Sequence, residues 1–140
     1  MRESGLPADI VSRLKTLGGV LAESCDAIDF AYLFGSASTG RLGPRSDVDV
    51  AIHVSPAADP HTARLEAARA ATTHLGTDAV DLVLLNTAPL ALAGRVLTTR
   101  QVILDRQPFQ RHLYESIVAR MFQDFRIREH RLLAERYSRG

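Results

Sequence analysis

Cysteine is almost missing from this sequence, because Cys25 is the only one among 140 residues. A single thiol cannot form an internal disulfide, and it excludes a metal centre built from several thiolates. The five histidines have none of the close spacings that zinc ligands show. We therefore expect a cytoplasmic chain that has neither a disulfide framework nor a zinc site.

Long apolar runs and an excess of either charge are also lacking. No uninterrupted apolar stretch approaches the length that spans a bilayer, and the first residues lack the apolar core of a signal peptide. The formal net charge is +1, from 17 basic and 16 acidic residues. This balance excludes a strongly basic nucleic-acid binder. We expect no membrane partner and no direct binding of nucleic acid.

Apolar residues make up 46% of the chain, which is enough for one core of ordinary size. Their spacing distinguishes helices, with a period near four, from strands, with a period of two. Helices are predicted at residues 8–23, 62–75, 90–97 and 109–137, and strands at 28–34, 46–54, 79–85 and 101–104. We expect one domain over residues 1–140. Its predicted class is a layered α/β fold, in which helices flank a small mixed sheet and a long helix ends the chain.

A glycine and a serine, Gly35 and Ser36, directly follow the strand predicted at 28–34. Such a pair starts a sharp turn in which backbone N–H groups and a hydroxyl point at an anion. Arg41 and Arg45, in the loop that follows, offer guanidinium groups to a phosphate. Taken alone, however, a Gly-Ser pair is more often an ordinary turn.

Two aspartates, Asp47 and Asp49, stand two residues apart in the next predicted strand. Residues at this spacing project from the same face, so two like charges are brought together. A divalent cation removes the repulsion, and Mg²⁺ accepts carboxylates, waters and substrate phosphate oxygens together. Two solvated acids at a strand end explain an isolated pair equally well.

A third aspartate, Asp81, is the one charged residue in the predicted strand at 79–85. An unpaired carboxylate in an apolar strand is unfavourable unless it meets a cation or lies at the strand end. Near a metal site it can also act as a general base towards an attacking hydroxyl. The alternative is an exposed acid at the start of the strand.

The spacing of Gly35 and Ser36 from Asp47 and Asp49, with ten residues between the pairs, matches the signature of the DNA polymerase β-like nucleotidyltransferase superfamily. The run at residues 33–52 resembles its minimal, single-domain branch, and most closely the MntA-type antitoxins of bacterial HEPN/MNT toxin–antitoxin modules. Residues 80–86 are similar to the strand that bears the third carboxylate of that family. The resemblance covers most of the chain.

This resemblance implies an adenylyltransferase that attaches AMP from ATP to a tyrosine of a cognate HEPN ribonuclease toxin, in a hetero-oligomer. It implies that Asp47, Asp49 and Asp81 hold Mg²⁺, as two ions, and that Gly35 and Ser36 hold the triphosphate. Many members have an arginine directly after the Gly-Ser pair. Here that position is Ala37, so the contact is absent or comes from Arg41 or Arg45.

Two other functions are compatible with the sequence. One is nucleotidyl transfer to a small molecule such as an aminoglycoside, although those enzymes usually need additional structure for the acceptor. The other is a non-catalytic antitoxin that acts by binding alone, which the three acids argue against. The final helix is the expected docking element for a protein partner. Arginines follow its apolar part. The apolar residues of this helix, which stand at helical spacing, are Phe109, Leu113, Ile117, Met121, Phe122 and Phe125.

Overall fold

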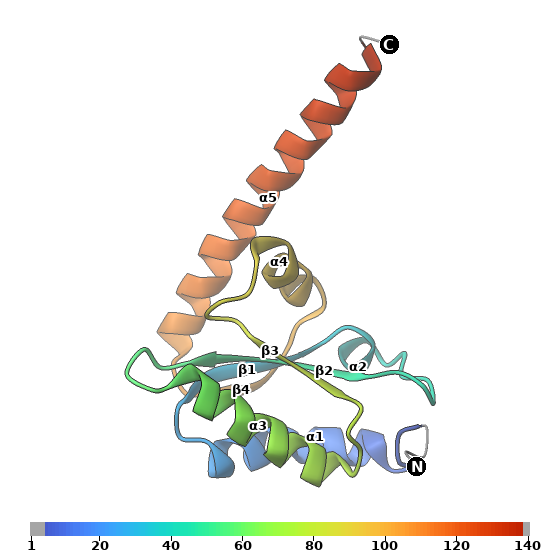
Figure 1. The fold of residues 1–140 in the computed structure, drawn as a ribbon, viewed down its shortest axis with the longest axis vertical. Helices are drawn as coiled ribbons and strands as arrows, with labels where there is room; N and C mark the ends of the chain where they lie inside the picture. Colours follow the sequence, from blue (N-terminus) through green and yellow to red (C-terminus); the bar gives the residue numbers. More distant parts are fainter. Residues whose placement is uncertain (1–4, 139–140) are drawn as a thin grey trace.

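A four-stranded mixed sheet forms the centre of the molecule in the computed structural model, which describes residues 5–138 (Figure 1). Its strands are β1 (Ile28–Phe34), β2 (Val48–Val54), β3 (Val80–Leu84) and β4 (Gln101–Asp105). The helices are α1 (Ile10–Ser24), α2 (Ser36–Thr39), α3 (Pro60–Leu75), α4 (Leu90–Thr99) and α5 (Pro108–Ser138). The predicted class, a mixed sheet flanked by helices with a long final helix, is confirmed.

The strands lie in the order β3, β2, β1, β4. β1 is antiparallel to both β2 and β4, whereas β2 and β3 are parallel. The register places Asp49 of β2 between Phe34, the last residue of β1, and Asp81 of β3. The pairing of the strands therefore brings the turn after β1 and two of the predicted acids to the same end of the three strands.

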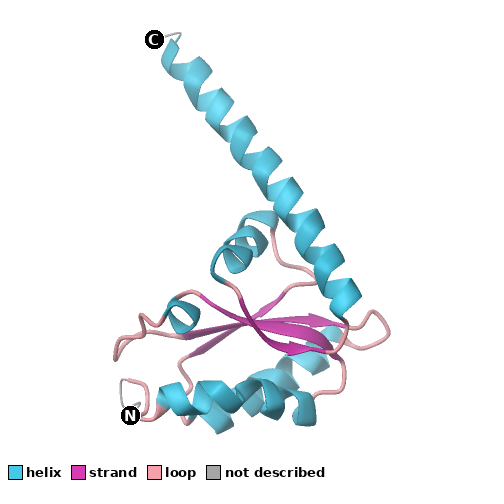
Figure 2. Cartoon of the chain, turned by 180° about the vertical axis from the view of Figure 1, so that it is seen from behind, coloured by secondary structure: helices cyan, strands magenta, loops and turns pink. Residues whose placement is uncertain are grey.

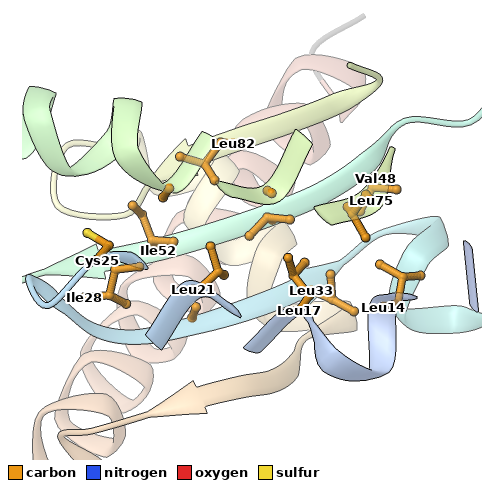
Figure 3. Packing of buried hydrophobic residues seen from close by; sticks show 14 of the residues in the cluster. Leu14, Leu17, Leu21, Cys25, Ile28, Leu33, Val48, Ile52, Leu75 and Leu82 are labelled. Carbon is orange, nitrogen blue, oxygen red and sulfur yellow. The ribbon is translucent and has the colours of Figure 1, made fainter. Parts of the chain in front are cut away.

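Helices α1 and α3 cover one face of the sheet (Figure 2). Helix α1 buries the apolar residues that predicted it, which are Ile10, Leu14, Leu17 and Leu21. Helix α3 presents Ala63, Ala67 and Ala71 to the core, small side chains that allow α1 and α3 to pack closely. Leucines of α1 meet β-branched residues of β1 and β2 in this layer (Figure 3). The cluster contains only apolar residues and Cys25.

Helix α4 and the first half of α5 cover the opposite face. Phe30, Tyr32 and Ala51 of the sheet pack there against Val96 and Val118. This layer also contains polar contacts. The Tyr32 hydroxyl donates a 2.7 Å hydrogen bond to Glu115 Oε2, and Arg111 Nη1 donates to the same oxygen at 3.1 Å.

The second half of α5 extends well beyond the rest of the molecule (Figure 1). Val118 is the last buried residue among residues 108–136, and Phe122 packs against Gly94 of α4. Five of the six apolar residues in the predicted docking stripe are exposed: Phe109, Leu113, Ile117, Met121 and Phe125. Within residues 5–138 no helix is long and apolar enough to cross a membrane.

Candidate active site

The turn after β1 requires a glycine. Gly35 has a φ of +65°, a left-handed conformation that side chains with a Cβ rarely adopt. A Cβ added there would lie 2.5 Å from Asp49 Oδ2. The Gly35 N–H donates a 2.8 Å hydrogen bond to Thr99 Oγ1 at the end of α4. Gly35 therefore lets the backbone pass directly beside an aspartate, and α4 fixes its position.

The three predicted acids differ in their surroundings. Asp49 is partly buried within β2, whereas Asp47, directly before β2, and Asp81 in β3 are exposed. Burial raises the pKa of Asp49, and the negative charges of Asp81 and Asp47 raise it further. Asp47 and Asp81 are therefore both close enough to Asp49 to repel its carboxylate.

These acids supply oxygen donors and negative charge but form no closed cage. Among residues 5–138, no three His, Cys, Asp or Glu side chains converge so as to hold a metal ion by themselves. Mg²⁺ suits such an open arrangement, since it commonly takes one or two carboxylates and completes its shell with water and phosphate oxygens. The raised pKa of Asp49 indicates that a cation would be favoured beside it. The residues present therefore fit Mg²⁺.

A cavity of about 800 Å³ opens beside Asp49 and Asp81. Its volume is that of a typical small-molecule site. It extends along β3 and is bounded on the other side by α4. The lining includes Phe34, Gly35, Asp49, His61, Arg64, Asp81, Leu82, Val83, Leu84, Leu92, Arg95 and Thr99.

The cavity brings together some of the predicted site residues and leaves others outside. Gly35, Asp49 and Asp81 line it, and Ser36 follows Gly35 as the first residue of α2. Asp47 does not line it, although its charge acts on Asp49. Arg41 and Arg45 are exposed in the loop between α2 and β2 and do not line this cavity. Their contact with a phosphate stays a prediction.

Three basic residues of the cavity, His61, Arg64 and Arg95, were not predicted from the sequence. They belong to α3 and α4 and lie outside the Gly-Ser and Asp-x-Asp motifs. No local spacing connects them to those motifs. Only the parallel pairing of β2 with β3, and the return of α4 towards Gly35, places them at the same cavity.

Residues 17–109 match the family model described as polymerase beta, nucleotidyltransferase. The chain belongs to this nucleotidyltransferase family. The match covers the turn at Gly35, all three acids and the cavity between β3 and α4. The sequence-based assignment to this superfamily is therefore confirmed. A search among curated proteins found none that matches.

Several solved structures share the fold. In a crystal structure of a toxin–antitoxin with AMP-PNP, one chain has 27% sequence identity and a TM-score of 0.68, covering 88% of this chain and 96% of its own. A doubly substituted variant of the toxin–antitoxin MntA–HpeT gives 25% identity and a TM-score of 0.69, with the same coverage. A tri-AMPylated Shewanella oneidensis HEPN toxin in complex with MNT antitoxin gives 23% and 0.65, covering 89% and 95%. This chain is thus similar in fold to chains of toxin–antitoxin complexes.

Proposed function

We propose that this nucleotidyltransferase is an antitoxin that transfers AMP from ATP to a tyrosine of a cognate HEPN ribonuclease toxin, with Mg²⁺ as cofactor. One observation carries the proposal: Gly35 from the turn after β1, Asp49 from β2 and Asp81 from β3 line one cavity of a chain in this family. The similarity to a toxin–antitoxin with AMP-PNP supports an adenine nucleotide as donor. The tyrosine acceptor and the HEPN partner rest on the resemblance of residues 33–52 to MntA-type antitoxins.

Each site residue has a specific role in this proposal. Gly35 and Ser36 hold the triphosphate, and Asp47, Asp49 and Asp81 hold Mg²⁺. When bound, Mg²⁺ neutralises the carboxylates and stabilises the charge that develops on the phosphate. Asp81, an exposed acid that lines the cavity, accepts the proton of the attacking hydroxyl.

The transfer is a single displacement at phosphorus. The tyrosine oxygen forms a bond to the α-phosphorus of ATP, while the bond between that phosphorus and the bridging oxygen of the β-phosphate breaks. Pyrophosphate leaves, and AMP stays on the tyrosine. The proton of the hydroxyl passes to Asp81. The protein must position the tyrosine hydroxyl opposite the leaving pyrophosphate, because the displacement proceeds in line.

Helix α5 is the proposed contact with the toxin. Leu113, Ile117, Met121 and Phe125 repeat every four residues, and each residue is 46–51% exposed. Apolar residues at this spacing form a continuous ridge, which is a common way for a helix to dock in a groove of a partner. Exposed arginines of the projecting half, among them Arg126 and Arg131, extend this surface.

The proposal is tested by incubating the full chain with the purified toxin, ATP and Mg²⁺, and by measuring the intact mass and ribonuclease activity of the toxin. We expect its mass to rise by whole AMP units while its ribonuclease activity falls. Lost ribonuclease activity without a mass change would indicate inhibition by binding alone. An unchanged toxin together with an adenylylated aminoglycoside, offered in a parallel reaction, would indicate a small-molecule enzyme.

A further inference from the structure

The cavity beside the carboxylates has a basic side. Arg64 of α3 and Arg95 of α4 line it, together with His61. Neither guanidinium has a hydrogen bond or an ion pair with another residue in the described part of the chain. A guanidinium without a protein partner on a cavity wall is well suited to bind a carboxylate or a phosphate.

Arg64 and the Gly35 turn lie towards different ends of the cavity. Asp81 stands near the start of β3 and Leu84 at its end. β2 is parallel to β3, and α3 begins soon after β2 ends, so the first turns of α3 lie towards the end of β3. Arg64 belongs to these turns. Gly35 instead adjoins Asp49, near the start of both strands.

The geometry of the displacement gives these two ends different roles. The attacking oxygen and the leaving pyrophosphate occupy opposite sides of the α-phosphorus. The proposed function, on which this step rests, places the triphosphate at Gly35 and Ser36. The acceptor must then approach from the other side of the carboxylates, along β3. Arg64 lines this part of the cavity, and Arg95, one helical turn before Thr99, lines the wall between it and Gly35.

The remaining wall of that part is apolar. Val83 and Leu92, which belong to the α4 side of the sheet, line it and offer a surface for an aromatic ring. We infer that the groove along β3 is an acceptor subsite, in which Val83 and Leu92 contact the tyrosine ring and Arg64 and Arg95 bind an oxyanion carried next to it. That oxyanion is a carboxylate of a neighbouring acidic residue or a phosphate on the acceptor. The groove therefore selects acceptors that bear negative charge.

The inference is tested with phosphotyrosine as a probe for an aromatic ring that carries an oxyanion. Calorimetry measures its dissociation constant in full-length protein already saturated with AMP-PNP and Mg²⁺, so that the donor side is filled. We compare wild type with Arg64→Ala, Arg95→Ala and the double variant. Arg69→Ala is the matched control, because Arg69 is an exposed arginine of the same helix and does not line this cavity.

We expect the double variant to bind phosphotyrosine about tenfold more weakly or worse, the loss of one charge-assisted hydrogen bond or more. Arg69→Ala should match wild type, and the affinity for AMP-PNP should change by less than about twofold in every variant. Equal phosphotyrosine binding by wild type and the double variant overturns the inference. An equal loss of AMP-PNP affinity overturns it as well, since the arginines would then bind the donor.

A second experiment distinguishes whether the groove recognises a carboxylate or a phosphate. The same titration is carried out with tyrosine peptides in which the tyrosine is flanked by glutamate or by alanine. Tighter binding of the glutamate peptide, lost in the double variant, supports recognition of an acidic neighbour. Failure of AMP transfer to the toxin would contradict the proposed function but leave these binding measurements unchanged. The two proposals therefore fail independently.

Discussion

The two faces of the sheet have different chemistry. The face covered by α1 and α3 is an apolar layer in which Leu17, Leu21 and Leu75 are completely buried. The face covered by α4 and α5 includes a hydrogen-bonded group around Glu115, and the 800 Å³ cavity opens beside its α4 layer. The first face supplies most of the stability, and the second carries the polar and charged groups that a reaction requires. Substitutions on the two faces should therefore have different consequences.

The largest effect on stability is expected on the α1 and α3 face. Leu21→Ala removes a fully buried side chain from between α1 and the sheet, and the free energy of unfolding should fall by about 2–5 kcal/mol. Urea denaturation measures the loss. Where the variant is still folded, AMP transfer should be close to that of wild type. A loss under about 1 kcal/mol would show that this layer tolerates cavities and is not the stabilising face.

A smaller effect is expected at Glu115, where α5 meets the sheet. Burial acts to raise the pKa of Glu115, but hydrogen bonds from Tyr32 and Arg111 and the charges of Arg100 and Arg111 lower it overall. A lowered pKa stabilises the folded state above the ordinary pKa of glutamate, and this stability is lost as the pH falls through the folded value. Glu115→Gln should cost about 1–3 kcal/mol at neutral pH and flatten the acid side of the stability profile.

Denaturation of wild type and Glu115→Gln from pH 3 to pH 7 checks this prediction. The two proteins should differ most at neutral pH, and the difference should shrink as the pH falls below the ordinary pKa of glutamate and the carboxyl of wild type takes up a proton, first in the unfolded and then in the folded state. A constant difference across this range would mean that the charge of Glu115 does not stabilise the contact.

The smallest effect on stability, with the opposite sign, is expected at Asp49. Its pKa is raised, first by burial and then by Asp81 and Asp47. A raised carboxyl pKa gives stability that is present below the unfolded pKa and is lost as the pH rises through the folded value. In metal-free buffer at pH 7, Asp49→Asn should therefore raise the melting temperature, and the gain should disappear in acid.

Thermal unfolding in the presence of EDTA measures this change. Asp26→Asn is the control, because Asp26 is an exposed acid before β1, away from the cavity, and should leave the melting temperature unchanged. A lower melting temperature for Asp49→Asn at pH 7 would contradict the view that repulsion among the acids destabilises the metal-free site.

Much of the fold was predictable because local patterns correspond to local structure. The apolar run ended by Gly35 predicted β1 with its observed bounds, and the alternation after Ser46 predicted β2, which begins at Val48. The packing face of α5 was not predictable. Met121 and Phe125 continue an apolar ridge, yet the polar contacts of Glu115 and the space above Gly94 decide which side meets the sheet.

The candidate site divides in the same way. The turn at Gly35 and the acids Asp47 and Asp49 lie within one short stretch, so their spacing was informative. Arg64 and Arg95 reach the cavity only through the order of the strands and the direction of α4. The spacing of residues along the sequence does not predict such long-range contacts unless the topology is known. The basic side of the site therefore emerged from the structure.

The central claim is that this protein transfers AMP to the toxin and that the aspartates at the start of β2 and β3 are required for the transfer. Its most direct test is the transfer of radiolabelled AMP from ATP to the toxin by wild type, Asp49→Asn and Asp26→Asn, in the presence of Mg²⁺. We predict labelled toxin with wild type and Asp26→Asn, and only background label with Asp49→Asn, although that variant is folded. Labelling by Asp49→Asn at the wild-type rate would contradict the account.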